Sequence, residues 1–300
     1  ASPNPGVGAL IVRDGRVVGR GWTMPGGRPH AEAAALQGAG EAARGATLYV
    51  TLEPCAHQSS RGPACADLVG DAGLARAVIG MPDPDPRTAG EGIARLESAG
   101  VSVSMTDWDA AILNLSGHAA MLAHDRPHVT LKLAMSLDGC IATSSGESKW
   151  ITGEAARAHT HRERARADAI LVGGGTLRAD APRLDVRLPG LEARSPKRIA
   201  LTSGEVPESW QAIRSPEEIA GLEDLRYLMV EGGAQTASAF LAARLVDRLL
   251  IYRAPVLLGG GTPAIGAIGH DTLEAAFADG LKLQSHRQLG SDTLEVYQRG

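Results

Sequence analysis

Aromatic side chains are scarce in this 300-residue sequence, since Phe, Trp and Tyr together make up 3% of it. The charges nearly balance, because 30 Lys and Arg stand against 34 Asp and Glu, for a formal net charge of -4. A nucleic-acid-binding surface usually combines an excess of basic charge with aromatic rings that stack on bases. Such a surface is therefore not expected here, and a small anionic ligand would need only a local basic site.

Long apolar runs are absent as well. No stretch reaches the roughly 18 apolar residues that a transmembrane helix requires, and the first residues, ASPNPGVGALIV, lack a basic region followed by an apolar one. The three cysteines are an odd number and do not suggest a disulfide framework. These absences predict a soluble, cytoplasmic protein.

The length and pattern of the chain predict two α/β domains. With 44% hydrophobic residues, the chain can bury two cores. In the first third, strand-like and helix-like segments alternate in the order ββαβαβαβ, beginning with a hairpin around Asp14-Gly15, which predicts a three-layer domain. We expect a first domain at residues 1–123, a linker at 124–128 and a second α/β domain at 129–300 that ends in a β-hairpin.

One short loop contains two of the three cysteines. Cys55 follows the apolar strand ATLYVT, and Cys65 opens the predicted helix ACADLVGDAG. Together with His30, at the start of an Ala-rich helix, they offer one imidazole and two thiolates and leave the fourth tetrahedral position of a zinc ion to water. Near a helix N-terminus the thiolate form is favoured. This donor set predicts a hydrolytic zinc site.

Glu32 is the proton shuttle that such a site requires. It stands two residues after His30 and would take a proton from the zinc-bound water and deliver it to leaving ammonia. His-x-Glu followed by Pro-Cys and a second Cys is the pattern of zinc nucleobase deaminases. Two ordinary buried thiols or a closed structural zinc site are the alternatives, with His57 as a possible fourth ligand. We expect His57 instead to face the substrate.

The second half has weaker signals. Gly173-Gly174-Gly175-Thr176 follows a strand, and Gly232-Gly233 lies between a strand and the helix AQTASAFLAARL. Glycines at such turns allow a phosphate to approach the backbone at a helix N-terminus. Neither run is a GxGxxG fingerprint, so each is equally compatible with a tight turn.

Motifs along nearly the whole chain resemble those of the bifunctional deaminase and reductase of riboflavin biosynthesis. In the first half they are Pro3-Asn4-Pro5-Gly6-Val7-Gly8, His30-Ala31-Glu32, Thr51-Leu52-Glu53-Pro54-Cys55-Ala56-His57 and Asp83-Pro84-Asp85-Pro86. In the second half they are Lys132-Leu133-Ala134-Met135-Ser136-Leu137-Asp138-Gly139, Gly146-Glu147-Ser148-Lys149-Trp150-Ile151-Thr152 and Val230-Glu231-Gly232-Gly233.

The resemblance implies a first domain of the cytidine-deaminase type. It would hydrolyse the 2-amino group of 2,5-diamino-6-(ribosylamino)-4-pyrimidinone 5′-phosphate, with zinc held by His30, Cys55 and Cys65. By the same resemblance Asn4 holds the pyrimidine, and Arg61 lies in the loop near the phosphate of the substrate. Asn4 as a turn residue and Arg61 as a solvated charge are the alternatives. Thr23 stands where the resemblance leads us to expect a substrate-contacting histidine.

For the second domain the resemblance implies a dihydrofolate-reductase-type fold that uses NADPH to reduce the ribosyl side chain to ribityl. Lys132 and Glu231 are the charged groups on predicted strand ends that are best placed to polarise the sugar carbonyl or to orient the base. Arg164 and Arg187 suit a phosphate, because an arginine fork matches phosphate oxygens. A salt bridge is the alternative for these arginines, and a core position for Trp150. The implied cofactor contacts are Ala134, Trp150, Thr176, Asp180, Ser203 and Gly233, and the implied substrate contacts are Ser148, Arg164, Leu184, Arg187 and Glu231.

The leading hypothesis is therefore a bifunctional enzyme with zinc and NADPH as cofactors. It acts on a small phosphorylated pyrimidine, contacts neither nucleic acid nor membrane, and by resemblance forms a homo-oligomer through the reductase domain. A monofunctional reductase with an inactive or altered deaminase domain is one alternative. A non-catalytic nucleotide-binding or RNA-binding module is the other.

Overall fold

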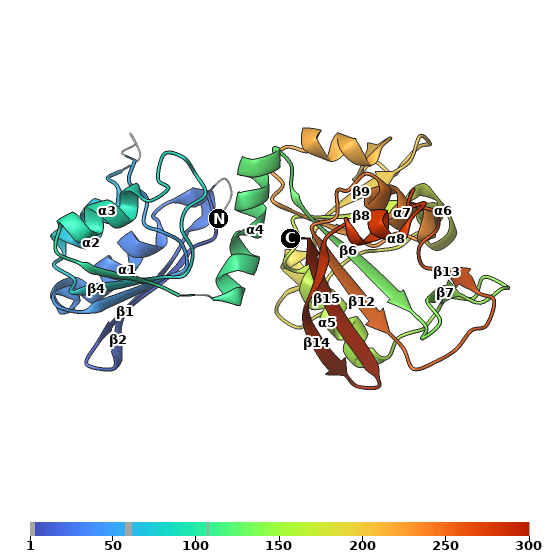
Figure 1. Ribbon diagram of the computed structural model, residues 1–300, viewed down its shortest axis with the longest axis horizontal. Coiled ribbons are helices and arrows are strands. Elements are labelled where there is room, and N and C mark those ends of the chain that lie inside the picture. Colours follow the sequence, from blue (N-terminus) through green and yellow to red (C-terminus); the bar gives the residue numbers. More distant parts are fainter. Residues whose placement is uncertain (1–3, 58–61, 107, 300) are drawn as a thin grey trace. The chain divides into compact units, whose positions relative to one another are not determined.

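The computed structural model describes residues 4–57, 62–106 and 108–299 and divides the chain into two units, Ala1–Asp125 and Arg126–Gly300 (Figure 1). No helix within the described ranges is long and apolar enough to cross a membrane. Each unit has its own sheet and its own hydrophobic core. The units are therefore described separately.

The first unit is built on a five-stranded sheet in the order β2-β1-β3-β4-β5, in which only the pairs involving β1 are antiparallel. Its strands are β1 (Gly8–Arg13), β2 (Arg16–Trp22), β3 (Thr47–Val50), β4 (Arg76–Ile79) and β5 (Ser102–Met105). Its helices are α1 (Ala31–Ala39), α2 (Cys65–Asp71), α3 (Glu91–Ser98) and α4 (Asp109–His124), with 3-10 turns at η1 (Pro25–Gly27) and η2 (Gly40–Ala43). The predicted hairpin is present, and Asp14 and Gly15 both have the positive φ of its tight turn.

Helix α1 lies directly on the backbone of β2. A Cβ atom at Gly21 would stand 2.0 Å from the carbonyl oxygen of Ala31, and one at Gly19 would stand 2.2 Å from that of Ala35. The buried face of α1 consists of Ala31, Glu32, Ala35 and Ala39. Because only glycine permits this close approach, the strand sequence RVVGRG fixes where α1 begins and so where His30 lies.

The second unit has an eight-stranded sheet in the order β10-β9-β8-β11-β6-β12-β15-β14, in which only the two C-terminal strands run antiparallel to their neighbours. The strands of this sheet are β6 (His128–Met135), β8 (Ala169–Gly173), β9 (Lys197–Leu201), β10 (Trp210–Ile213), β11 (Tyr227–Val230), β12 (Arg248–Arg253), β14 (Leu281–Leu289) and β15 (Asp292–Arg299). Two further strands, β7 (Cys140–Ala142) and β13 (Thr262–Pro263), pair with each other in a separate two-stranded sheet. Its helices are α5 (Glu154–Arg164), α6 (Gly174–Asp180), α7 (Ala234–Ala242) and α8 (Leu273–Phe277), with η3 (Glu192–Arg194) and η4 (Pro216–Gly221).

The centre of this sheet is buried on both faces. Every residue of β8 is buried, which fits its unbroken apolar sequence AILVG and its parallel partners on either side. Parallel strands align their carboxyl ends at one edge of the sheet, so the residues after β8, β9 and β11 lie near one another. The predicted C-terminal hairpin is confirmed as β14 and β15, and Figure 1 shows it beside β12.

Candidate deaminase and reductase sites

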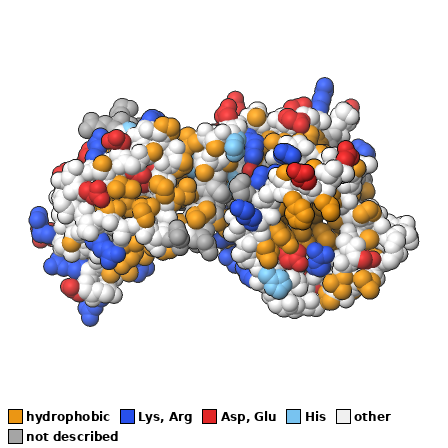
Figure 2. Space-filling view, viewed as in Figure 1, with side chains coloured by type: hydrophobic (Ala, Val, Ile, Leu, Met, Phe, Trp, Pro, Cys, Tyr) orange, Lys and Arg blue, Asp and Glu red, His pale blue; other side chains and the backbone are white. Residues whose placement is uncertain are grey.

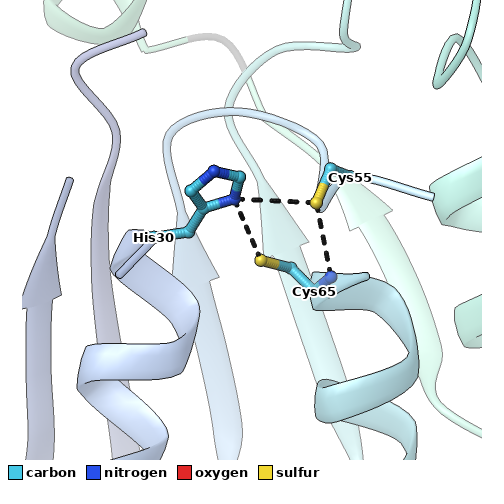
Figure 3. Close-up of side chains that lie close together, drawn as sticks. All are labelled: His30, Cys55 and Cys65. Atoms are coloured by element: carbon cyan, nitrogen blue, oxygen red, sulfur yellow. Dashed lines mark hydrogen bonds between the residues drawn. The ribbon is translucent and has the colours of Figure 1, made fainter. Parts of the chain in front are cut away.

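His30, Cys55 and Cys65 meet at the N-termini of α1 and α2, as Figure 3 shows. The Nδ1 atom of His30 lies 3.3 Å from the Sγ of Cys65 and 3.6 Å from the Sγ of Cys55. All three ligand atoms lie within 4.8 Å of one another, and both thiols are buried. His30 is the N-cap of α1 and Cys65 is the first residue of α2, as the sequence predicted.

These distances suit a zinc ion. Zinc bonds of about 2.3 Å to sulfur and 2.0 Å to nitrogen place tetrahedral ligand atoms about 3.5 Å apart. The backbone N–H of Cys65 donates to the Sγ of Cys55 over 3.3 Å. The pKa of Cys55 is lowered to about 4, chiefly because it accepts a hydrogen bond from the Cys65 thiol, against the opposing effect of burial. The same hydrogen bond, together with burial, raises the pKa of Cys65. The cluster therefore stabilises the thiolate of Cys55, and Cys65 releases its proton when zinc binds.

Glu32 lies beside this cluster with only 3% of its surface exposed. Burial raises the pKa of Glu32 to about 7. A carboxyl group with a pKa near the working pH can both accept and release a proton, which is what a proton shuttle between water and a leaving amine requires. The cluster thus combines three metal donors with a poised acid-base group.

Among the other residues that the sequence singled out in the first unit, Arg61 falls outside the described residues. Asn4 contacts His30, with 2.8 Å between Nδ2 and Nε2, so it is more than a turn residue. The Nδ1 of His57 lies 3.4 Å from the Oγ1 of Thr88, and His57 is not part of the three-residue donor group. Thr23 is buried, and its hydroxyl accepts the N–H of Val7 over 3.0 Å, which is a structural role.

The structural role of Glu53 was not predicted from the sequence. This carboxylate is 2% exposed and accepts backbone N–H groups from Asp83, Gly90 and Ile93 over 3.1 to 3.2 Å. It therefore holds the loop after β4 against the loop that carries Cys55. Glu53 stands in the motif Thr51-Leu52-Glu53-Pro54, but its spacing gave no indication of which backbone groups it would meet.

The second unit has a cavity of about 570 Å³. Predicted site residues that line it are Lys132, Ala134, Ser148, Trp150, Arg164, Asp180, Leu184, Arg187 and Glu231. Lining residues that the sequence did not single out include Lys149, Arg157, Thr160, His161 and Arg183. Thr176, Ser203 and Gly233 do not line this cavity. Residues far apart in sequence thus form one site with both charged and apolar walls.

A buried ionic group forms one wall of the cavity. Arg164 grips Glu231 with two hydrogen bonds, of 2.7 Å from Nε and 2.8 Å from Nη2. The Nζ of Lys132 lies 4.0 Å from the Oε2 of Glu231. Burial lowers the pKa of Lys132, and although burial alone would raise that of Glu231, the hydrogen bonds from Arg164 hold it below its usual range. Burial thus disfavours the charged form of Lys132, and the nearby Glu231 carboxylate opposes that effect.

The mouth of the cavity is basic and more exposed. Arg187 and Arg183 are 55% and 77% exposed and both contact Asp185, over 2.8 and 2.7 Å. Lys149 reaches Asp180 over 2.7 Å. Trp150 is 71% exposed and stacks with the guanidinium of Arg157 at 5.1 Å, so it is not a core residue. Exposed ion pairs contribute little stability, which leaves these cations able to exchange partners for an anionic ligand.

The glycine-rich turns of the second unit show two different uses. A Cβ at Gly173 or Gly232 would stand 2.3 Å from Thr236, so these glycines allow α7 to pack closely on the sheet. A Cβ at Gly175 would meet nothing within 4 Å, and one at Gly233 only the Thr176 hydroxyl at 4.0 Å. None of the four has the positive φ of a tight turn. Gly175 and Gly233 thus leave backbone accessible at the starts of α6 and α7, which fits a dinucleotide phosphate.

Comparison with known families agrees with both halves of this description. Residues 1–81 match the cytidine and deoxycytidylate deaminase zinc-binding region, and residues 127–294 match the RibD C-terminal domain. The chain is 36% identical over 338 residues to the riboflavin biosynthesis protein RibD of Aquifex aeolicus, covering 99% of this chain and 93% of that protein. It is 38% identical to RibD of Escherichia coli, covering 97% and 92%.

Solved structures share this fold over nearly the whole chain. RibD of Acinetobacter baumannii is similar with a TM-score of 0.83 at 34% identity, covering 100% of this chain and 94% of that one. A diaminohydroxyphosphoribosylaminopyrimidine deaminase/5-amino-6-(5-phosphoribosylamino)uracil reductase from Thermotoga maritima has a TM-score of 0.83 at 29% identity, covering 99% and 93%. Fold and site together define a zinc-dependent deaminase joined to a reductase.

The chain belongs to the RibD family of riboflavin biosynthesis proteins. The predicted fold class is confirmed, with a cytidine-deaminase-like unit followed by a dihydrofolate-reductase-like unit. The predicted family, its enzyme class and its zinc and NADPH cofactors are confirmed in the same way.

Proposed function

We propose that this chain carries out two successive steps of riboflavin biosynthesis. The first is hydrolytic deamination of 2,5-diamino-6-(ribosylamino)-4-pyrimidinone 5′-phosphate, and the second is reduction of the ribosyl side chain to ribityl. The observation that carries the proposal is the cluster of His30, Cys55 and Cys65 beside the buried Glu32, on the same chain as an ionic cavity in a reductase-type fold. We assign deamination to residues 1–123 and reduction to residues 129–300, joined by a linker at 124–128.

In the deaminase unit, water replaces the 2-amino group and ammonia leaves. When bound to His30, Cys55 and Cys65, a zinc ion supplies an activated water for this hydrolysis. The Glu32 carboxylate accepts a proton from the water and passes it to the amino nitrogen, so that the C–N bond breaks with ammonia as the leaving group. We assign Asn4 to the pyrimidine, His57 to the loop that faces the substrate, and Arg61 to the phosphate.

In the reductase unit, NADPH supplies the hydride when bound. Lys132 donates a hydrogen bond to the sugar oxygen, and Glu231 keeps the lysine charged and in place. Arg164 and Arg187 keep their assignment to the substrate with divided roles, because Arg164 fixes Glu231 while the exposed Arg187 is free to turn from Asp185 to the 5′-phosphate. Other proposed substrate contacts are Ser148 and Leu184, and proposed cofactor contacts are Ala134, Trp150, Thr176, Asp180, Ser203 and Gly233.

The proposed partners are a small phosphorylated pyrimidine and further copies of this chain. On the face seen in Figure 2, basic and acidic side chains are interspersed over both units, which supports the absence of a nucleic-acid partner. Membership in this family supports a cytoplasmic location, away from membranes. The three cysteines are free thiols, as is usual in a reducing compartment.

Mass spectrometry of the products tests the proposal. The purified chain is incubated with the diaminopyrimidinone substrate, zinc and NADPH, and we expect the deaminated ribityl product together with one ammonia per turnover. In a parallel reaction the deaminated uracil intermediate is supplied directly. Reduction of that intermediate without any conversion of the diaminopyrimidinone would contradict the bifunctional assignment and support a monofunctional reductase.

A further inference from the structure

Asn4 contacts the ring nitrogen of His30 that points away from the cysteines. The Nδ1 atom of His30 faces both Sγ atoms, whereas its Nε2 lies 2.8 Å from the side-chain amide of Asn4. Among the described residues, His30 is the one hydrogen-bonding partner of Asn4. The imidazole is therefore held from two opposite sides, by the metal donors on one and by an amide on the other.

The surrounding backbone is built to hold this amide in place. A Cβ at Gly27 would stand 2.7 Å from the Cγ and Oδ1 of Asn4, and Gly27 has a φ of +84°, which also favours glycine. Two hydrogen bonds join the segments on either side, from Val7 N to the Thr23 hydroxyl over 3.0 Å and from Thr23 N to the Val7 carbonyl over 2.9 Å. The position of Asn4 relative to His30 is therefore fixed by both segments.

The protonation of His30 decides which amide atom faces it. A histidine that binds a metal through Nδ1 carries its proton on Nε2, so Nε2 is a donor and requires an acceptor. The Asn4 amide meets this requirement when its oxygen faces Nε2, an orientation that a half-turn about χ2 exchanges with its nitrogen. In that orientation the amide nitrogen, with two N–H donors, takes the place of Oδ1 beside Gly27.

We propose that Asn4 is a positioning residue for the metal ligand His30. Its amide oxygen accepts the Nε2 proton and fixes the tautomer whose Nδ1 binds zinc. This role stands on the His30 contact alone, whereas the substrate contact assigned to Asn4 above rests on the proposed deaminase function.

Two substitutions at Asn4 separate these roles. Asn4→Asp keeps an acceptor for the Nε2 proton but removes the N–H donor, whereas Asn4→Ala removes both. We expect Asn4→Ala to lose zinc to a colorimetric chelator about 10-fold faster than the wild type or more, which is the usual effect of losing such a partner. We expect Asn4→Asp to hold zinc at least as well as the wild type while its kcat/KM for ammonia release falls at least 10-fold.

Further variants act as controls. Gly27→Ala displaces Asn4 without altering its chemistry, so zinc release should lie between those of the wild type and Asn4→Ala, and it tests the proposal even if Asn4→Ala does not fold. Gln37→Ala, at an exposed position of α1, should release zinc at the wild-type rate. Wild-type zinc retention in Asn4→Ala, or equal loss in Asn4→Asp and Asn4→Ala, would overturn the positioning role. A wild-type chain that holds zinc but releases no ammonia would contradict the proposed function instead.

Discussion

The metal cluster of the first unit and the cavity of the second are built in different ways. The cluster takes its three ligands from the N-termini of two neighbouring helices and the loop before one of them. The cavity draws its ionic wall from β6, α5 and the end of β11, between residues 132 and 231. A metal site uses rare residue types with strict geometry, so its chemistry is visible in a short stretch of sequence. The cavity uses common charged residues, whose roles depend on which of them the fold buries together.

Replacing Glu32 should give the largest effect and confine it to the first site. Glu32→Gln keeps the shape of the side chain but cannot accept a proton, so ammonia release should fall by about 10² to 10⁴-fold. Zinc content, measured by metal analysis, should stay near one per chain, and reduction of the uracil intermediate should not change. Equal loss of both activities would mean that the two sites are not independent.

Removing the Arg164–Glu231 ion pair from the cavity should lower stability as well as activity, unlike the Glu32 substitution in the first unit. Arg164→Met leaves the buried Glu231 carboxylate without its guanidinium partner, which should cost about 3 to 5 kcal/mol in the free energy of unfolding. Hydrogen exchange of the β6 and β11 amides would locate the loss in the second unit. The matched control is Arg253→Met, which breaks the more exposed pair with Glu295 and should cost about 1 kcal/mol or less. Similar costs for both variants would show that burial of the Arg164 pair adds nothing.

A fall in pH should lower the unfolding free energy of the second unit, because His128 is buried in its neutral form. Burial lowers the pKa of His128 from 6.5 to about 4, so between these values the unfolded chain binds a proton that the folded chain does not. Stability contributed by the neutral ring is therefore complete above pH 6.5 and is lost as the pH falls, by about 2 kcal/mol at pH 4.5.

The measurement compares unfolding free energies of the wild type and His128→Phe from pH 7 to pH 4.5. The variant should lose less stability over this range, because its ring does not titrate. His286→Gln, at an exposed position of β14, should follow the wild type. A pH dependence that is identical in His128→Phe and the wild type would remove His128 as its cause.

The smallest expected effect is at Thr23. Thr23→Val keeps the shape but removes the hydroxyl that accepts the Val7 N–H, which then keeps only its bond to the Pro5 carbonyl over 3.1 Å. This loss should cost about 1 kcal/mol. Thr23→Ser keeps the hydroxyl and should restore most of that loss in thermal unfolding. If Thr23→Val left stability unchanged and raised the KM for the diaminopyrimidinone, Thr23 would be a substrate contact and not a structural residue.

Much of the fold could be predicted from local sequence patterns. The hairpin at Asp14-Gly15, the Ala-rich helix after His30 and the C-terminal hairpin all follow from turn chemistry and periodicity. The short strands β7, β10 and β13 were not predicted, because strands of two to four residues carry little periodicity. The place of Glu53 could not be predicted either, since its three backbone partners come from a loop some thirty to forty residues away.

The sequence by itself determined the family and indicated the candidate zinc donors and the proposed proton shuttle, because these depend on residue types at short spacings. Only the tertiary structure decided that Arg164 grips Glu231, that Trp150 is exposed and that Asn4 meets the second nitrogen of His30. The two contacts join segments that are distant along the chain. Their strength comes from burial and geometry, which arise only when the sheets and helices have packed.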